Sequence, residues 1–153
     1  MDIFLQSITE GGDYVLLGND IQGSSELYNQ IFLALFGGNR EQSTKREYAI
    51  GESRFDWWAN ALLFPENDVR QYNSLTERTL VNVSLTSAGR QEVEEAVKVD
   101  LTYLQALGKT EVLVYLISSN KIQIDVSITE PSGEQKQEYS FVWDSARNEI
   151  INS

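Results

Sequence analysis

Arg54-Phe55-Asp56-Trp57-Trp58 opens the stretch of sequence, residues 54–108, around which the rest of the chain is organised. The stretch continues through Asn73-Ser74-Leu75-Thr76-Glu77-Arg78, ends in a long amphipathic helix, and holds two of the three tryptophans of the protein. Adjacent tryptophans cannot share one face of a helix or strand, so we expect one indole in the core and the other near the surface. An aromatic cluster with a polar rim is more typical of a docking surface than of an active site.

Two helices are predicted in the second half of this stretch. Ser74 and Glu77 match a capping box, which predicts a short helix from about residue 75 to 84. The alternative is a strand, because apolar residues alternate over positions 81–85. Thr86 or Ser87 then caps the main helix, and Gly108 ends it as a C′ glycine. The apolar seam of the main helix, widened by an alanine, is Val93, Ala96, Val97, Leu101, Leu104 and Leu107.

The N-terminal part predicts a hairpin and a first helix. Residues 2–22 contain two apolar runs separated by a Gly-rich turn, as in a short β-hairpin or extended pair. Ser24 or Ser25 can cap a helix that runs to Phe36, with Glu26 in its first turn. Gly37-Gly38-Asn39 supplies a left-handed stop, and the polar residues 39–51 are predicted to form a loop.

The last third changes from a helical period to an alternating one. Residues 112–117 are apolar on both faces, which predicts a central strand or one that is covered on both sides. Residues 122–128 alternate apolar and polar side chains, and Tyr139, Phe141 and Trp143 mark a third strand. We therefore expect one α+β domain, residues 1–153, with an N-terminal β-hairpin and three helices packed on one face of a C-terminal antiparallel meander.

Composition excludes several kinds of chemistry. The 153 residues include no histidine and no cysteine, so disulfides, thiol catalysis and imidazole acid–base catalysis are absent. The formal charge of −11 disfavours binding to nucleic acid and to anionic membranes. It suits either simple solubility or a basic protein partner, including a host protein that is inhibited by nucleic-acid mimicry. The sequence predicts no cofactor and no metal site.

Carboxylates are the remaining candidates for catalysis. Asp56 with Glu66 or Asp68, near the aromatic residues, allows a carbohydrate-active hydrolase that cleaves cell-wall glycan through paired acids. Most of the 23 acidic residues are nevertheless expected to be solvated surface. The preferred interpretation is a non-enzymatic protein interface. Arginine beside tryptophan and tyrosine is typical of binding hot spots, and ordinary surface ion pairing explains the arginines equally well. The candidate interaction residues are Arg54, Trp57, Trp58, Tyr72 and Arg78.

The same residues resemble a known family. Arg54-Phe55-Asp56-Trp57-Trp58-Ala59-Asn60 resembles the Arg-x-x-Trp-Trp-type element of the Mu-like phage baseplate proteins, which are related to the small wedge protein of contractile tails. Residues 73–80, followed by the acidic helix and the paired strands, are similar to the second half of that family. Where many relatives have glycines around the tryptophans, this chain has Phe55 and Asp56 before them and Ala59 and Asn60 after them.

The resemblance implies a structural role without enzymatic activity. It implies a baseplate wedge subunit, encoded by a phage or prophage and made in the bacterial cytoplasm before it enters a virion tail or tail-like particle. Its partners would be other baseplate or tail proteins. The sequence leaves the oligomeric state open. The strand after Glu130 extends past the usual end of the family.

Overall fold

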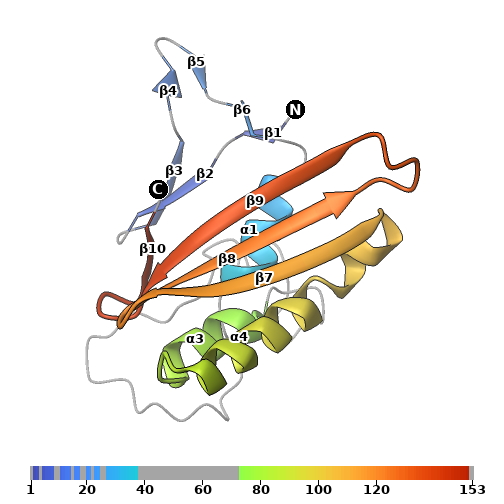
Figure 1. Ribbon diagram of the computed structural model, residues 1–153. Helices are drawn as coiled ribbons and strands as arrows, with labels where there is room; N and C mark the ends of the chain where they lie inside the picture. The colour runs from blue at the N-terminus through green and yellow to red at the C-terminus, as the bar shows by residue number, and fades with distance from the viewer. Residues whose placement is uncertain are drawn as a thin grey trace. The chain divides into compact units, whose positions relative to one another are not determined.

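The computed structural model describes residues 27–37 and 73–151, together with the backbone of six short strands between residues 2 and 24 (Figure 1). The chain divides into two compact units, Met1–Arg78 and Thr79–Ser153, each of which is described by itself. The architecture of the described residues is α+β, as the sequence predicts. The prediction of a single domain stays a prediction.

The six N-terminal strands form three small antiparallel pairs. The pairs are β1 (Asp2–Ile3) with β6 (Gly23–Ser24), β2 (Leu5–Ile8) with β3 (Gly11–Tyr14), and β4 (Leu16–Leu17) with β5 (Asp20–Ile21).

Helix α1 (Tyr28–Phe36) confirms the predicted first helix and its end at Phe36, but its N-terminus differs from the prediction. The N-cap residue is Leu27 and no side chain caps it, so the expected cap by Ser24 or Ser25 is wrong. The first turn of α1 contains no acidic residue, contrary to the prediction made for position 26. Gly37 is the C-cap of α1 with a φ of −81°, and the other two residues of the predicted left-handed stop, Gly38 and Asn39, lie outside the described residues. The buried apolar side chains of α1 are Ile31 and Leu35, one helical turn apart.

A single serine joins the end of α1 to the start of α3 (Leu75–Asn82). The Gly37 N–H donates to Ser74 Oγ over 3.1 Å, and Ser74 Oγ donates to the Ala34 carbonyl over 2.6 Å. Helix C-termini leave main-chain groups without helical partners, and this hydroxyl satisfies two of them. Ser74 is fully buried, so these bonds are shielded from water. The alternative strand over residues 81–85 is wrong, because α3 continues to Asn82.

Helix α4 (Ser87–Asp100) begins as predicted and ends early. Thr86 is its N-cap, and the Thr86 side chain accepts a hydrogen bond from the Gly89 N–H over 3.2 Å. Gly89 lies so close to the preceding turn that a Cβ built on it would be 2.0 Å from the Ser84 carbonyl oxygen. After Leu101 the chain tightens into the 3-10 helix η1 (Thr102–Ala106), so the predicted single helix to residue 107 is wrong.

The end of the predicted seam also differs from expectation. Leu101 and Leu104 are fully buried, but Leu107 is 46% exposed and does not belong to the core. Gly108 is not in the left-handed region, so it is no C′ glycine of the expected kind. A Cβ on Gly108 would lie 2.2 Å from the Thr129 carbonyl oxygen. Glycine is required here because two segments of backbone approach closely.

A four-stranded antiparallel sheet forms the C-terminal part in the order β10-β9-β8-β7 (Figure 1). Its strands are β7 (Lys109–Ser118), β8 (Lys121–Thr129), β9 (Lys136–Asp144) and β10 (Glu149–Ile151). Strand β10 was not predicted from the sequence. Strand β7 lies at the edge of the sheet and not at its centre, which corrects the expectation drawn from its continuous apolar run.

One face of the sheet lies on the core, and α4 lies against β7 (Figure 1). The register places Val114, Ile124 and Phe141 in one row across three strands. The alternation of buried and less buried residues along β8 and β9 is the one predicted. The buried apolar side chains of the unit that begins at residue 79 are Leu80, Val93, Ala96, Val97, Leu101, Leu104, Val112, Val114, Ile122, Ile124, Val126, Ile128, Tyr139, Phe141 and Trp143.

Candidate interaction surface

Most of the interaction residues predicted from the sequence lie outside the described residues. This holds for Arg54, Trp57, Trp58 and Tyr72, and also for the three carboxylates considered for catalysis. Arg78 is described: it lies half-buried in α3, and its main-chain N–H donates to the Ser74 carbonyl over 3.4 Å. The predicted aromatic cluster and the alternative acid pair therefore remain predictions.

A different candidate surface lies within the described residues, on the outer face of β7. Three large apolar side chains at alternate positions of this strand are open to solvent: Leu113 is 55%, Tyr115 46% and Ile117 51% exposed. We call these three residues the β7 row. Soluble proteins seldom gather large apolar side chains on one exposed strand unless the strand binds something. Residues 112–117 carry the sequence signal for this surface, but apolar side chains on both faces predict a central strand or one that is covered on both sides.

A polar network lies beside the β7 row on the same face of the sheet. Leu113 pairs with Asp125 in the register, and Tyr115 pairs with Gln123. Gln123 Nε2 donates to Asp125 Oδ1 over 2.8 Å, and Ser140 Oγ donates to the same oxygen over 2.6 Å. The carboxylate is thus held in place by two donors. The apolar row therefore has a fixed polar margin on its inner side.

Charged residues close one end of the row. Lys109 and Glu111 form an ion pair of 2.6 Å on β7, and the pKa of Glu111 is lowered mainly by the hydrogen bond from Lys109. Lys136 and Glu138 form a second pair of 2.5 Å on β9, and this contact raises the pKa of Lys136. An apolar centre with a charged rim is the usual anatomy of a protein interface.

Two hydrogen bonds at the ends of β8 and β9 show which way the main-chain groups of β8 point. The Glu130 N–H donates to the Gln135 carbonyl over 3.1 Å, and the Ser145 N–H donates to the Asn120 carbonyl over 2.8 Å. Main-chain groups of successive residues in a strand point to opposite sides. The even-numbered residues of β8 therefore bond to β9, and the odd-numbered residues bond to β7.

The same alternation identifies the free edge of β7. Leu113 and Tyr115 pair with odd-numbered residues of β8, so they are the positions that bond inward. The N–H and carbonyl groups of the intervening residues point away from the sheet, and within the described ranges no further strand pairs with them. These edge residues are Thr110, Val112, Val114 and Leu116.

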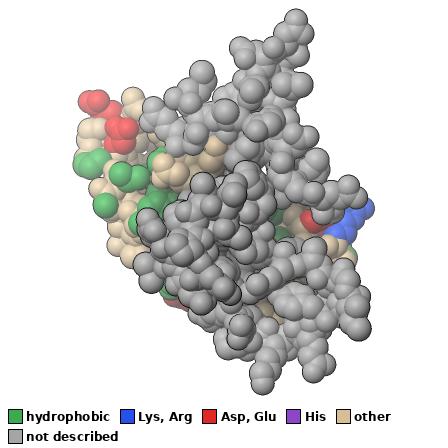
Figure 2. Space-filling view, turned by 180° about the vertical axis from the view of Figure 1, so that it is seen from behind, with side chains coloured by type: hydrophobic (Ala, Val, Ile, Leu, Met, Phe, Trp, Pro, Cys, Tyr) green, Lys and Arg blue, Asp and Glu red, His purple; other side chains and the backbone are tan. Residues whose placement is uncertain are grey.

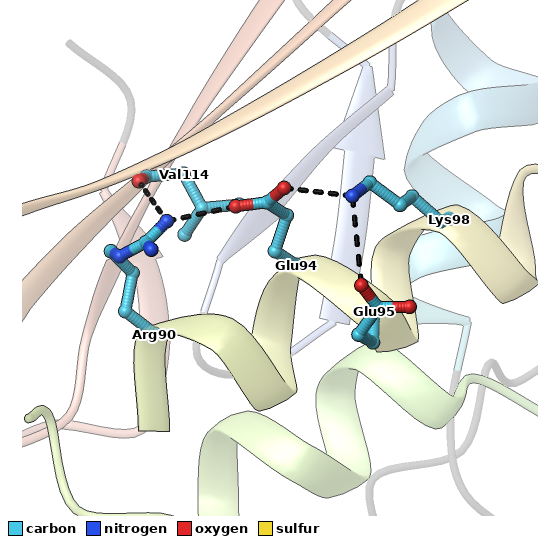
Figure 3. Close-up of polar contacts among 5 residues, drawn as sticks. All are labelled: Arg90, Glu94, Glu95, Lys98 and Val114. Atoms are coloured by element: carbon cyan, nitrogen blue, oxygen red, sulfur yellow. Dashed lines mark hydrogen bonds and ion pairs between the residues drawn. The ribbon is translucent and has the colours of Figure 1, made fainter. Parts of the chain in front are cut away.

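A chain of charged groups on α4 reaches this edge (Figure 3). Arg90 Nη1 donates to the Val114 carbonyl over 3.3 Å and to Glu94 Oε2 over 2.8 Å. Lys98 Nζ donates to Glu94 Oε1 over 2.8 Å and forms a longer ion pair of 3.6 Å with Glu95. The hydrogen bond from Lys98, followed by that from Arg90, lowers the pKa of Glu94. The helix thereby holds a guanidinium against the middle of the edge strand.

A second set of exposed apolar residues lies on α4 and the segment after it. Val99 (59%), Tyr103 (44%) and Leu107 (46%) recur at steps of four residues. Figure 2 shows hydrophobic side chains of described residues open at one margin of the molecule, with acidic side chains beside them. The residues of this second set lie in α4, in η1 and at the C-cap of η1, so their side chains can offer apolar contact without main-chain strand pairing.

The described ranges contain no group of three or more acidic side chains placed to hold a metal ion. No helix among the described residues combines the length and the hydrophobicity that crossing a bilayer requires. Comparisons of the chain with protein-family models, with curated proteins and with solved structures find no match.

Proposed function

We propose that this protein is a structural, non-enzymatic subunit of a phage or prophage tail baseplate, and that it assembles with other proteins of a contractile tail. The observation that supports an assembly role is the β7 row beside a strand edge. The assignment to a baseplate rests on the resemblance of residues 54–60 and 73–80 to the Mu-like baseplate proteins. The subunit would be made in the bacterial cytoplasm and then enter the virion tail or a tail-like particle.

The proposal includes the finer fold predicted from the sequence. In it, the N-terminal residues form a β-hairpin, and three helices pack on one face of the C-terminal meander. The opposite face of the meander, which bears the β7 row, then faces the neighbouring subunit. The Arg54, Trp57 and Trp58 cluster is a second contact in this scheme, since tryptophan and arginine dominate most binding hot spots.

The size of the β7 contribution follows from exposure. Complete burial of a large apolar side chain stabilises by about 1.5–3 kcal/mol, and roughly half of each side chain in the row is already buried. Covering all three residues therefore contributes on the order of 3 kcal/mol, which is roughly a hundredfold in Kd. Part of this gain is offset by the entropy lost on association.

The test is co-purification with the neighbouring tail proteins. The chain is co-expressed with the baseplate and tail proteins encoded beside its gene, and an affinity tag on this chain is used to recover the complex. Leu113→Ser combined with Tyr115→Ser is expected to reduce recovery strongly. Val99→Ser is the matched comparison, because it removes a similarly exposed apolar side chain from α4 and so tests the second exposed set separately. Circular dichroism verifies that both variants fold.

The outcomes separate the parts of the proposal. If the unaltered chain recovers no tail protein, the baseplate assignment fails. If the Leu113 and Tyr115 double variant recovers as much partner as the unaltered chain, the β7 row is not the contact. Trp57→Ala or Trp58→Ala is expected to lower stability or abolish co-purification. Two tryptophan variants that stay folded and still assemble would remove that cluster from the interface.

A further inference from the structure

The edge of β7 combines two features that invite pairing with another strand. It is ten residues long, and its side chains remain apolar on the exposed face. Long, exposed, apolar edge strands are the usual sites of unwanted sheet-to-sheet association, and proteins block them with charges, bulges or covering elements. A register shift between Leu116 and Ser118 interrupts one end of this strand. The middle of the strand is regular.

A second copy of the same strand would fit this edge. Antiparallel pairing about a twofold axis makes each strand complementary to itself. With Val114 opposite Val114 of the second copy, the outward-pointing even-numbered groups pair with one another, and Leu113 of each copy faces Tyr115 of the other. Shifting the register by two residues in either direction keeps the even-numbered positions opposite one another, so the pairing still uses the Val114 carbonyl.

In the structure, Arg90 already donates a hydrogen bond to the Val114 carbonyl that this pairing would need. Its guanidinium donates to the Val114 carbonyl and to Glu94, and Lys98 holds Glu94 from the other side (Figure 3). A guanidinium fixed by a charge-assisted hydrogen bond is a directed donor and not a freely moving surface charge. The Arg90 side chain is 31% exposed and that of Glu94 23%, so both are partly withdrawn from water.

We propose that Arg90 blocks dimerisation through the edge of β7. Arg90 donates a hydrogen bond to the Val114 carbonyl and places a charged side chain beside it, and this prevents β7 from pairing with β7 of a second copy. The inference concerns the free chain and does not depend on the identity of any tail partner. Removing the guanidinium frees the acceptor and leaves the apolar row beside an open edge.

The test uses the purified chain alone and compares two substitutions with the same change in charge. Arg90→Gln removes the donor while keeping a good helix former on α4. Arg147→Gln is the control, because Arg147 is exposed and its ion pair with Glu149 lies in the turn between β9 and β10, away from the β7 edge. Sedimentation velocity over a range of concentrations measures the dimer Kd. It is expected to be at least about tenfold lower for Arg90→Gln than for Arg147→Gln.

Hydrogen exchange identifies the surface that associates. In the Arg90→Gln dimer, the amides of Val112, Val114 and Leu116 are expected to exchange more slowly as concentration rises. Adding Leu113→Ser and Tyr115→Ser to Arg90→Gln is expected to restore the Kd of the control. Equal Kd values for the Arg90 and Arg147 variants overturn the proposal. Tighter association without protection of these amides, or association that persists in the triple variant, overturns it as well.

Discussion

Gly89→Ala is expected to destabilise this protein, although the same change in an ordinary exposed helix is stabilising. Gly89 is in the first turn of α4, where alanine is favoured over glycine by about 1 kcal/mol on helix propensity alone. Against this, the new Cβ would be 2.0 Å from the Ser84 carbonyl oxygen and 3.2 Å from the Ser84 carbonyl carbon. These are main-chain atoms, so a change of side-chain rotamer cannot relieve the clash.

The magnitude follows from what has to move. The Ser84 carbonyl accepts the Thr86 N–H over 2.8 Å, and the Thr86 side chain accepts the Gly89 N–H as the helix cap. Overpacking costs about 1–3 kcal/mol, and weakening the cap costs about 1 kcal/mol more. After the propensity gain is subtracted, the free energy of unfolding is expected to fall by about 1–3 kcal/mol. For a chain of this length, each kilocalorie corresponds to roughly 2–4 °C in Tm.

Urea denaturation followed by circular dichroism measures the change. Ala88→Gly, at the exposed neighbouring position, is the reference, and it is expected to cost about 1 kcal/mol through propensity alone. The reasoning is refuted if Gly89→Ala raises the free energy of unfolding by about the amount that Ala88→Gly lowers it. That result would mean that the close approach to Ser84 has no energetic weight.

Three further predictions address the core, the ion network and the contact between α1 and α3. Ile124→Ala is expected to lower the free energy of unfolding by about 2–5 kcal/mol in urea denaturation, because Ile124 is fully buried, whereas Leu113→Ala is expected to lower it by only about 1 kcal/mol, because Leu113 is 55% exposed; equal effects would contradict the assignment of the two sheet faces. The pKa of Glu94 is lowered in the folded state, so its stabilising contribution is present above its ordinary value near 4.5 and is lost as the pH falls through the lowered pKa. Glu94→Gln is therefore expected to flatten the dependence of stability on pH between about 5 and 3, and an unchanged slope would rule out this contribution. Ser74→Ala is expected to cost about 1–3 kcal/mol, since it leaves the main-chain groups of Gly37 and Ala34 without their buried partner, and a neutral result would show that the hydroxyl is dispensable.

Periodicity predicted the parts of this fold in which one face of an element is apolar. The core positions at residues 93 and 97 of α4, at its C-cap residue 101 and at residue 104 of η1, and the alternation along β8, follow directly from which side chains must leave water. The cap at Thr86 was readable because its hydroxyl acts within three residues of its own position. Local chemistry of this kind leaves a local signal in the sequence.

Features that depend on distant partners left no such signal. Ser74 matches a capping box, yet its hydroxyl binds the end of a helix about 40 positions earlier. Gly108 follows an apolar seam as a helix-ending glycine would, and only the position of Thr129 explains why it is glycine. The continuous apolar run of β7 predicts that both faces of the strand are buried. It carries no information on which element would cover the outer face. The exposed β7 row could not be predicted for the same reason that β7 could not be placed at the edge of the sheet: the sequence does not show whether another element covers its second face.

The order of the sheet has a consequence for how the chain folds. Among the residues that the structure describes, each of the strands β7, β8, β9 and β10 is hydrogen-bonded only to strands adjacent to it in the sequence. Contacts between segments that are near in sequence require little loop-closure entropy and are associated with fast folding. The sheet can therefore grow one hairpin at a time as synthesis proceeds, without waiting for a remote segment to arrive.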